Sequence, residues 1–230
     1  DACTSYGTLL FWPFSNERIT WNNISIVDPL FTIPVLILVG VAVKTKKRIY
    51  SFFSIGWVIF YLSLGLIQYE RALSAANDLA ESRGHNPERL TLKPSFGNLI
   101  LWKSIYQNEQ TFYVDAIRTV QSSIVCSGES IEIFNYQQHL PGLDKESQQA
   151  EDVERFRWFS QDYLGFDKEK KLVTDVRYSM LPNQIEPMWG LIINDQLTNK
   201  DHAIWWTGRD LDQRKWNLFI GMLSGKECQK

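Results

Sequence analysis

The sequence predicts an α+β fold in which a two-helix transmembrane hairpin precedes a mainly antiparallel β-sheet domain with a few helices. Two long apolar runs, both between residues 24 and 69, predict the hairpin. Beyond residue 98, apolar and polar residues alternate in short runs separated by turn sequences, as they do in half-buried strands. The formal net charge of −2 gives no support for a nucleic-acid partner.

The second apolar run is the clearer membrane helix. It extends from Ile49 to Tyr69, reads IYSFFSIGWVIFYLSLGLIQY and holds no charged residue. About 20 apolar residues at a rise of 1.5 Å each cross a hydrocarbon core of roughly 30 Å, so the run is long enough to span. Its few polar side chains form no continuous stripe, which favours a transmembrane helix over the core helix of a soluble cytosolic protein.

The first apolar run extends from Ile24 to Val43 and is interrupted near its start by Asp28 and Pro29. Proline is tolerated in the first turn of a helix, and an aspartate just before it can cap the free amides. We therefore expect the helix to begin near Asp28. About 15 residues then remain before Lys44, which is short for a span. We still expect it to span, because another apolar helix follows after a tight link.

That link, residues 44–48, carries four basic residues in five positions. Short basic loops stay cytoplasmic, so residues 44–48 are predicted to be cytoplasmic and residues 72–230 extracytoplasmic, which is the periplasm in a Gram-negative bacterium. Residues 1–71 hold six basic and four acidic residues, whereas residues 72–230 hold eighteen and twenty-two. The predicted domains are an interfacial segment over residues 1–23, two transmembrane helices over residues 24–71 and an α+β domain over residues 72–230.

The elements of the α+β part are predicted from helix formers, alternation and turns. The second membrane helix is expected to continue through residues 70–83 and to end at Gly84. Residues 99–106 and 111–120 should form a β-hairpin, and residues 163–166 should pair with residues 171–180. Further strands are expected at residues 131–136, 188–193 and 203–208, and helices at residues 145–163 and 214–223.

Few residues of this part indicate catalysis. No helical histidine pair, nucleophile elbow or phosphate-binding loop is present, and the three histidines are isolated from one another: His85, His139 and His202. Cys126 and Cys228 either form a disulfide, if the domain is periplasmic, or stay as two thiols. The sequence leaves both alternatives open.

Aromatic residues are abundant, with nine tryptophans in the chain. The pairs at residues 158–159 and 205–206 are interpreted as core and cross-strand packing rather than as a ligand platform. Tyr6, Trp12 and Trp21 flank the first apolar run, which is typical of the aromatic belt at a membrane interface.

The N-terminal segment combines features that neither packing nor propensity explains together. They are Asp1-Ala-Cys-Thr-Ser-Tyr-Gly7, Leu10-Phe-Trp-Pro-Phe-Ser15, Trp21-Asn-Asn-Ile24 and Ile26-Val-Asp-Pro-Leu-Phe31. The segment closely resembles the membrane-bound metal-dependent hydrolase family called YdjM-like, whose members carry a stretch much like LLDAFTTYGTQLFWPFS followed by WNNIFIIDPLYT. Weaker similarity reaches residues 96–102, 112–114, 155–160 and 172–177, and the specificity is high only over residues 1–31.

The resemblance implies a multi-span inner-membrane enzyme with a divalent metal ion, zinc or manganese, that activates water for attack on an ester or phosphoester. The family's site combines a PDxD motif, an HRGxTHS motif and a His-x-x-x-Asp pair, and Asp1 matches the aspartate of that pair. Asp1 is thus the expected metal ligand, and Thr4, Tyr6 and Asp28 are expected to support the site or the fold around it. The other ligands would precede residue 1, so this chain is expected to be a fragment that does not retain the metal alone.

Two functions remain open from the sequence. One is the C-terminal part of a metal-dependent hydrolase of the bacterial inner membrane, with membrane lipid as its neighbouring partner. The other is a non-catalytic, membrane-anchored envelope domain that binds a ligand or a protein partner. The absence of a catalytic constellation within residues 72–230 favours the second.

Overall fold

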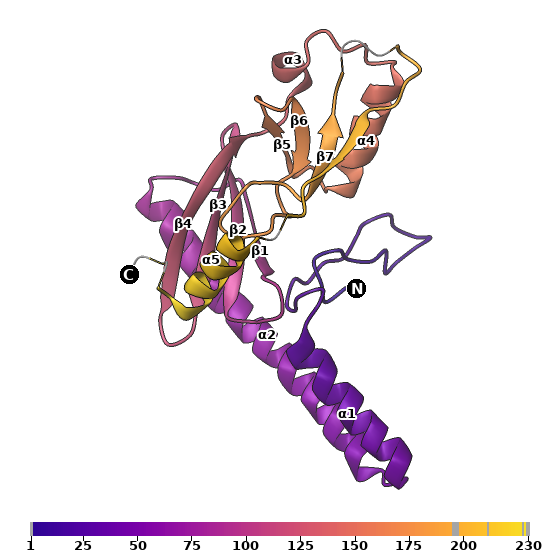
Figure 1. Ribbon diagram of the computed structural model, residues 1–230, viewed down its shortest axis with the longest axis vertical. Helices are drawn as coiled ribbons and strands as arrows, with labels where there is room; N and C mark the ends of the chain where they lie inside the picture. The colour runs from indigo at the N-terminus through magenta and orange to yellow at the C-terminus, as the bar shows by residue number, and fades with distance from the viewer. Residues whose placement is uncertain (1, 195–197, 211, 227, 229–230) are drawn as a thin grey trace.

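The computed structural model describes residues 2–194, 198–210, 212–226 and 228. Two helices form a long stalk, and two antiparallel sheets with shorter helices form a body at one end of it (Figure 1). The α+β class predicted from the sequence is confirmed.

The stalk begins with α1, Pro29–Thr45. As predicted, Asp28 caps this helix: its side chain accepts a hydrogen bond from the backbone N–H of Phe31 at 3.1 Å, and Pro29 stands in the first turn. Asp28 also fastens α1 to the second helix, because the Tyr61 hydroxyl lies 2.9 and 2.8 Å from its two carboxylate oxygens. These bonds satisfy a carboxylate that is almost fully buried.

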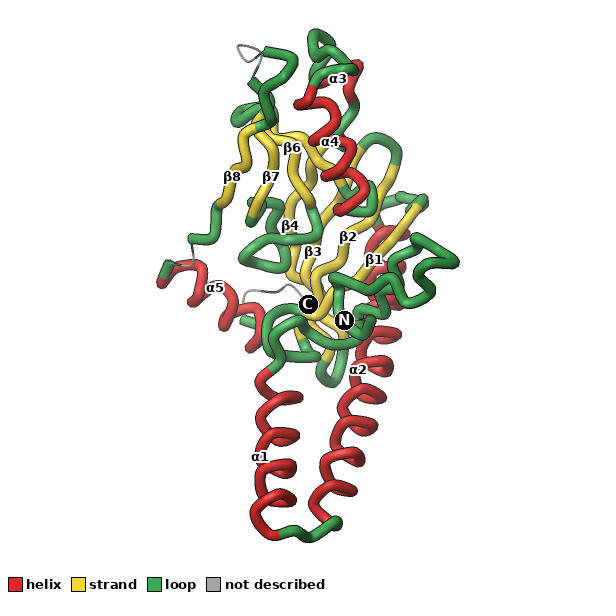
Figure 2. The backbone as a smooth tube through the Cα atoms, turned by 90° about the vertical axis from the view of Figure 1, so that its right-hand side faces the viewer, coloured by secondary structure: helices red, strands yellow, loops and turns green. Residues whose placement is uncertain are grey.

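The second helix, α2 (Ile49–Ser82), runs back along α1 and then continues past it into the body (Figure 2). Among the described helices, α2 alone is long and apolar enough to cross a membrane, since α1 has only 17 residues. The outer surface of both helices carries exposed apolar side chains: Leu36, Ile37, Val43, Phe52, Phe53, Ile59 and Phe60. One candidate span is therefore present, and the two-span hairpin stays a prediction.

The first sheet has the strand order β1-β2-β3-β4. Its strands are β1 Arg89–Pro94, β2 Leu101–Asn108, β3 Thr111–Thr119 and β4 Ser123–Glu132. The C-terminal part of α2 covers one face, where Ala72 and Ala76 pack with Leu92, Trp102 and Ile117. The predicted hairpin is confirmed as β2–β3, whereas β1 was not predicted.

The strand predicted over residues 131–136 is wrong in its bounds. β4 ends at Glu132, and a short helix, α3 (Tyr136–His139), follows it. The cause is Asn135, whose side chain accepts hydrogen bonds from the backbone N–H groups of Gln137 and Gln138 and so caps a helix at this point.

The second sheet has the order β5-β6-β7-β8, and α4 packs against it. These elements are α4 Gln148–Phe159, β5 Leu164–Asp167, β6 Leu172–Asp175, β7 Trp189–Ile192 and β8 Ile204–Thr207. The strand pairing predicted across residues 167–170 is confirmed, although β6 ends at Asp175 and not at residue 180. Helix α4 is shorter than predicted, because Ser147 caps its start and Gln161 and Asp162 take positive φ angles of 53° and 62° just after its end.

The last helix, α5 (Gln213–Ser224), covers the face of the first sheet that α2 leaves free. Phe219 and Met222 pack there with residues of β2 to β4, and the helix ends at Gly225 with φ +80°, close to the predicted end. A disulfide joins Cys126 of β4 to Cys228 across 102 positions. Of the two alternatives left open for these cysteines, the structure has the disulfide.

The N-terminal segment, residues 2–27, crosses the junction between stalk and body without forming a helix (Figure 1). Ile24 packs with Tyr61 of α2 and with Leu99. Close contact between the segment and α2 depends on Gly65, because a Cβ there would lie 2.2 Å from the carbonyl oxygen of Asn23. The segment is therefore part of the packed structure.

The aromatic side chains are less buried than the sequence predicts. Trp158 is 58% exposed, so its interpretation as core packing is wrong. Trp205 is 54% exposed, but its ring packs edge-on against Phe156 of α4. Trp12 and Trp21 are 67% and 54% exposed, as an interface belt requires.

Candidate functional site

One cavity of about 280 Å³ lies where the N-terminal segment meets both sheets. Its walls come from parts of the chain that are far apart in the sequence. They are residues 5–6 and 25–27, residues 93–96 at the end of β1, Lys103 of β2, and residues 177–180 between β6 and β7. Pro182, Met188, Trp189 and Phe219 complete the lining. Convergence of so many segments on one cavity is typical of a binding site.

Two buried lysines form the floor of this cavity. The register of the β1–β2 pair sets Lys93 directly opposite Lys103, and alternation along β1 and β2 turns both side chains away from α2. Lys93 is 7% exposed and Lys103 is 4% exposed. Lysine is almost never buried to this extent without a partner, so this pair is unusual.

Each ammonium group is held by oxygen atoms of the chain. Lys93 Nζ donates to the carbonyl oxygen of Arg177 at 2.9 Å and lies 3.2 Å from the ring centre of Tyr178. Lys103 Nζ donates to Ser179 Oγ at 2.6 Å and to the carbonyl oxygen of Gln184 at 2.7 Å. None of these acceptors carries a negative charge.

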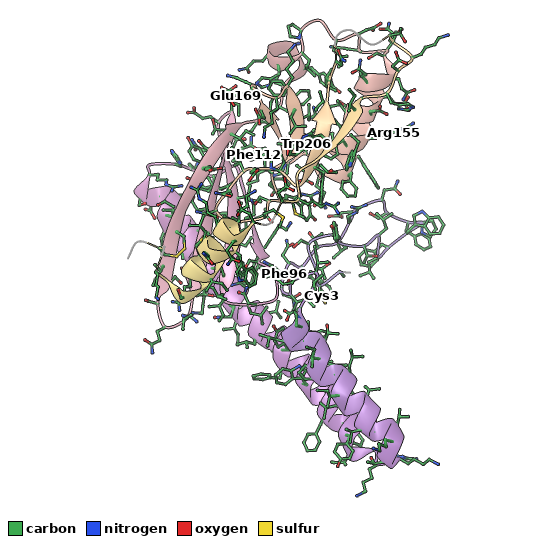
Figure 3. All side chains as sticks on the ribbon, viewed as in Figure 1. Cys3, Phe96, Phe112, Arg155, Glu169 and Trp206 are labelled. Carbon is green, nitrogen blue, oxygen red and sulfur yellow. A yellow bond between two sulfur atoms is a disulfide. The ribbon has the colours of Figure 1, made fainter. Side chains whose placement is uncertain are left out.

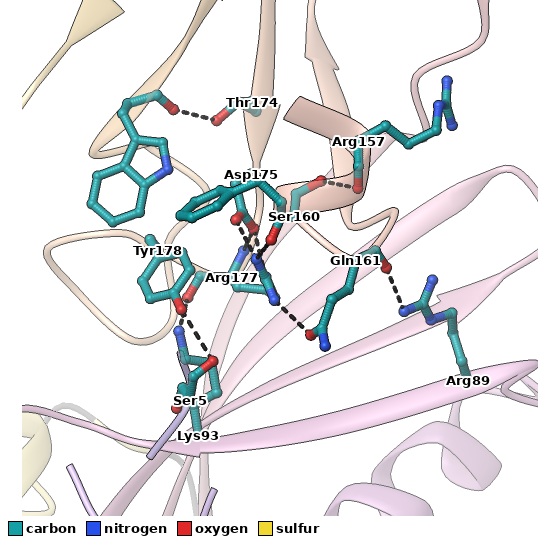
Figure 4. A network of polar contacts seen from close by, with 12 residues as sticks. Ser5, Arg89, Lys93, Arg157, Ser160, Gln161, Thr174, Asp175, Arg177 and Tyr178 are labelled. Carbon is teal, nitrogen blue, oxygen red and sulfur yellow. Dashed lines mark hydrogen bonds and ion pairs between the residues drawn. The ribbon is translucent and has the colours of Figure 1, made fainter. Parts of the chain in front are cut away.

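Arg177 holds the one carboxylate of this cluster (Figure 4). Its Nε and Nη2 donate to the two oxygens of Asp175 at 2.9 and 2.7 Å, and Asp175 is fully buried. The remaining donors of the guanidinium reach Gln161 Oε1 at 2.8 Å and the carbonyl oxygen of Phe159 at 3.0 Å. Arg177 thus forms a two-bond ion pair with Asp175 and neutralises its negative charge.

The charges in the cavity are unbalanced as a result. Among the described residues, Lys93, Lys103 and Arg177 face a single buried carboxylate, Asp175, which is already paired. Burial lowers the pKa of Lys93 well below its usual value, and it lowers the pKa of Lys103 to about 7 even though Asp175 and Glu129 act in the opposite direction. The cavity therefore holds more basic side chains than carboxylates, and a lysine that is protonated there has no free anion beside it.

Tyr178 connects this cluster to the N-terminal segment. Its hydroxyl donates to the carbonyl oxygen of Ser5 at 3.2 Å, and its ring stacks on Tyr6 with 5.4 Å between ring centres. Burial raises the pKa of Tyr178 above its usual value, so its hydroxyl stays protonated and remains a donor. The segment that resembles the hydrolase family is thus one wall of the cavity.

The residues predicted for the metal site have different positions. Asp1 lies outside the described residues, so the structure does not test it. Tyr6 lines the cavity, and Thr4 is half-buried two positions before it. Asp28 serves as the cap of α1 and the acceptor for Tyr61, which is the structural role that the sequence allowed.

The described residues do not fit a metal ion. Among them, no three histidine, cysteine, aspartate or glutamate side chains come close enough to hold one. The histidines lie apart and have different partners: His85 contacts the Tyr106 hydroxyl, and His202 contacts Asp152. His139 contacts Glu132 through Nε2 and accepts from the backbone N–H of Asn135 through Nδ1.

Residues 1–72 match the model of the YdjM inner membrane protein family. Over these residues the chain is similar to that family. The match covers the N-terminal segment, α1 and α2 as far as Ala72, and it confirms the resemblance seen over the first thirty-one residues. No curated protein and no solved structure matches the chain significantly.

Sequence reasoning missed the lysine cavity, although one signal for Lys103 was present. In the β2 hairpin strand, Leu101, Lys103 and Ile105 share one face, so a lysine occupies a position that alternation turns toward the core. Lys93 gave no such signal, because β1 was not predicted. The contact between Tyr178 and Ser5 spans 173 positions and has no local signature.

Proposed function

We propose that the chain is the C-terminal part of a metal-dependent hydrolase of the bacterial inner membrane. The match of residues 1–72 to the YdjM inner membrane protein family carries this proposal. The bound metal would supply an activated water for attack on an ester or phosphoester. Its ligands would be Asp1 and residues upstream of this sequence, because the described residues form no cluster that could hold it.

The proposal gives the α+β part the role of an accessory domain beside the membrane site. Its support is the contact between the two: Tyr178 bonds to Ser5 and stacks on Tyr6, and Ile24 packs with Leu99. A domain that contacts the N-terminal segment in this way can hold that segment in place. It can also shape the path along which a substrate arrives.

The hydrolase proposal is tested in the full-length protein, including any residues upstream of Asp1, purified in mild detergent. Metal content and esterase and phosphoesterase activities are measured for the wild type and for Asp1→Asn. We expect both quantities to fall in the variant, with Glu17→Gln, an exposed acid in the same segment, as the matched control. Unchanged metal content and activity in Asp1→Asn would reject the role of Asp1.

The same proposal includes a two-span topology with residues 44–48 cytoplasmic and the body periplasmic. Three features support it: the basic loop, the exposed apolar surface along both helices, and the disulfide between Cys126 and Cys228, since disulfides persist in oxidising compartments. We expect a membrane-impermeant maleimide to label Gln121→Cys in intact spheroplasts, and Thr45→Cys only after lysis, with Cys3 replaced by serine. The reverse pattern would refute the orientation.

The second function, a non-catalytic envelope domain that binds a ligand, is favoured by one observation. The cationic cavity combines binding groups with no neighbouring metal cluster among the described residues. Under this alternative, Asp1→Asn leaves every measurable function of the chain unchanged. Under the hydrolase proposal, it does not.

A further inference from the structure

We propose that the cavity between the N-terminal segment and β1 binds the anionic, phosphate-bearing headgroup of a membrane lipid. The binding groups are the ammonium groups of Lys93 and Lys103, and the lipid tails leave past Ile26, Val27 and Phe96. The inference rests on the membrane placement of the stalk and holds whether or not the chain takes part in hydrolysis.

The first argument is the surplus of hydrogen-bond donors. In its charged form a lysine side chain has three N–H donors; within the described chain, Lys93 makes one hydrogen bond and Lys103 makes two. The indole N–H of Trp189, another lining residue, is buried and has no acceptor among the described residues. Buried donors without acceptors are costly, so this cavity fits a ligand that consists of acceptors.

The second argument is charge. The two lysines lie side by side on neighbouring strands, and the buried carboxylate nearest to them is committed to Arg177. Cationic groups on two directly paired residues repel each other in a low-dielectric interior unless an anion lies between them or they lose their protons. A phosphate group between them supplies that anion, together with oxygen atoms for the unused donors.

The third argument is the position and the chemistry of the cavity mouth. Ile26, Val27 and Phe96 line the cavity, yet they are 44%, 55% and 58% exposed. Val27 lies two positions before α1, and the N–H of Gly97 donates to its carbonyl oxygen at 3.1 Å. Figure 3 shows Phe96 at the end of the body that joins the stalk. An apolar rim beside a membrane helix, above a cationic floor, matches an amphiphile with an anionic head.

The volume limits what can enter. Sites for small molecules begin at about 300 Å³, so a cavity of about 280 Å³ holds a headgroup and not a whole lipid. The tails must therefore stay outside, along the apolar rim. A free phosphate would accept hydrogen bonds from the same donors but would not contact the apolar rim.

The test uses the purified chain in mild nonionic detergent and isothermal titration calorimetry. Three probes are compared: dioctanoyl phosphatidylglycerol, dioctanoyl phosphatidylcholine with the same tails but a zwitterionic head, and sodium phosphate. We expect phosphatidylglycerol to bind at least about tenfold more tightly than either other probe. The reason is that each charge-assisted hydrogen bond raises the affinity by a factor of about ten or more. Equal binding of phosphatidylcholine, or equal binding of free phosphate, would overturn the assignment to an anionic lipid.

Variants locate the site. We expect Lys93→Met with Lys103→Met to weaken phosphatidylglycerol binding by at least about tenfold, whereas Lys168→Met, which removes the same charge from an exposed position, leaves it unchanged. Wild-type affinity in the double variant would refute the proposal.

A pH titration needs no variant and remains decisive if the double variant does not fold. The pKa of Lys103 is lowered to about 7, so the fraction that carries a charge falls about tenfold between pH 6 and pH 8. The charged and titratable groups that face the lysine pair are Glu129, Asp175, Arg177 and Tyr178. We expect the affinity for phosphatidylglycerol to fall about tenfold over this range. An affinity that is constant or rises would refute the proposal.

Discussion

The burial of Lys103 predicts an unusual dependence of stability on pH. This side chain is 4% exposed, and burial lowers its pKa from 10.5 to about 7 in the folded chain. Between these two values the unfolded chain binds one more proton than the folded chain, so the free energy of unfolding rises with pH. Integration between pH 7 and pH 9 gives about 2 kcal/mol of added stability from this group alone.

The measurement is urea unfolding in mild detergent at pH 7, 8 and 9, followed by tryptophan fluorescence. Lys93, whose pKa is also lowered, adds to the slope with the same sign, so the wild type alone does not isolate Lys103. Lys103→Met does, because methionine keeps a similar length without a proton to release. We expect the wild type to gain about 2 kcal/mol more than this variant from pH 7 to pH 9.

Lys168→Met is the control, because the Lys168 side chain is 62% exposed, and it should follow the wild type at every pH. Parallel slopes for the wild type and Lys103→Met would refute the reasoning, since they would mean that Lys103 binds its proton equally in the folded and the unfolded chain.

Two further predictions concern the tertiary contacts. Cys126→Ala with Cys228→Ala should lower the free energy of unfolding by about 4 to 5 kcal/mol, because the disulfide closes a loop of 102 positions; a melting temperature equal to that of the oxidised wild type would contradict this. Gly65→Val should release the N-terminal segment, since a Cβ at Gly65 would lie 2.2 Å from the Asn23 carbonyl oxygen, and faster tryptic cleavage within residues 2–27 would report it. Gly56→Val is the matched control, because a Cβ there meets nothing within 4 Å, and equal cleavage of both variants would contradict the contact.

Local signals explain which elements the sequence predicts well. Asp28 caps α1 and Gly225 ends α5, because a capping side chain and a glycine in the left-handed region act on their immediate neighbours. Strand β1 is a contrasting case. It lies at the edge of its sheet, pairs with β2 alone and ends at Pro94, which an edge strand tolerates but which weakens the signal for any strand.

The cavity could not be predicted for a different reason. Its floor depends on the register that sets Lys93 opposite Lys103, and its wall depends on the packing of residues 5–6 against Tyr178. Both are products of tertiary structure. A lysine at an inward position in a strand indicates an anomaly, but only the assembled sheets show that the anomaly is a pair of cations with one paired carboxylate nearby.

The topology and the cavity constrain each other. The basic loop, residues 44–48, lies at the end of the stalk that is far from the body (Figure 2). The disulfide and the cavity belong to the body at the other end. If the loop is cytoplasmic, as the positive-inside rule predicts, the mouth of the cavity faces the outer leaflet of the inner membrane, and the disulfide stands in an oxidising compartment. The lipid that the cavity binds would then be drawn from that leaflet. Labelling of Gln121→Cys from the outside therefore bears on the source of the ligand as well as on the topology.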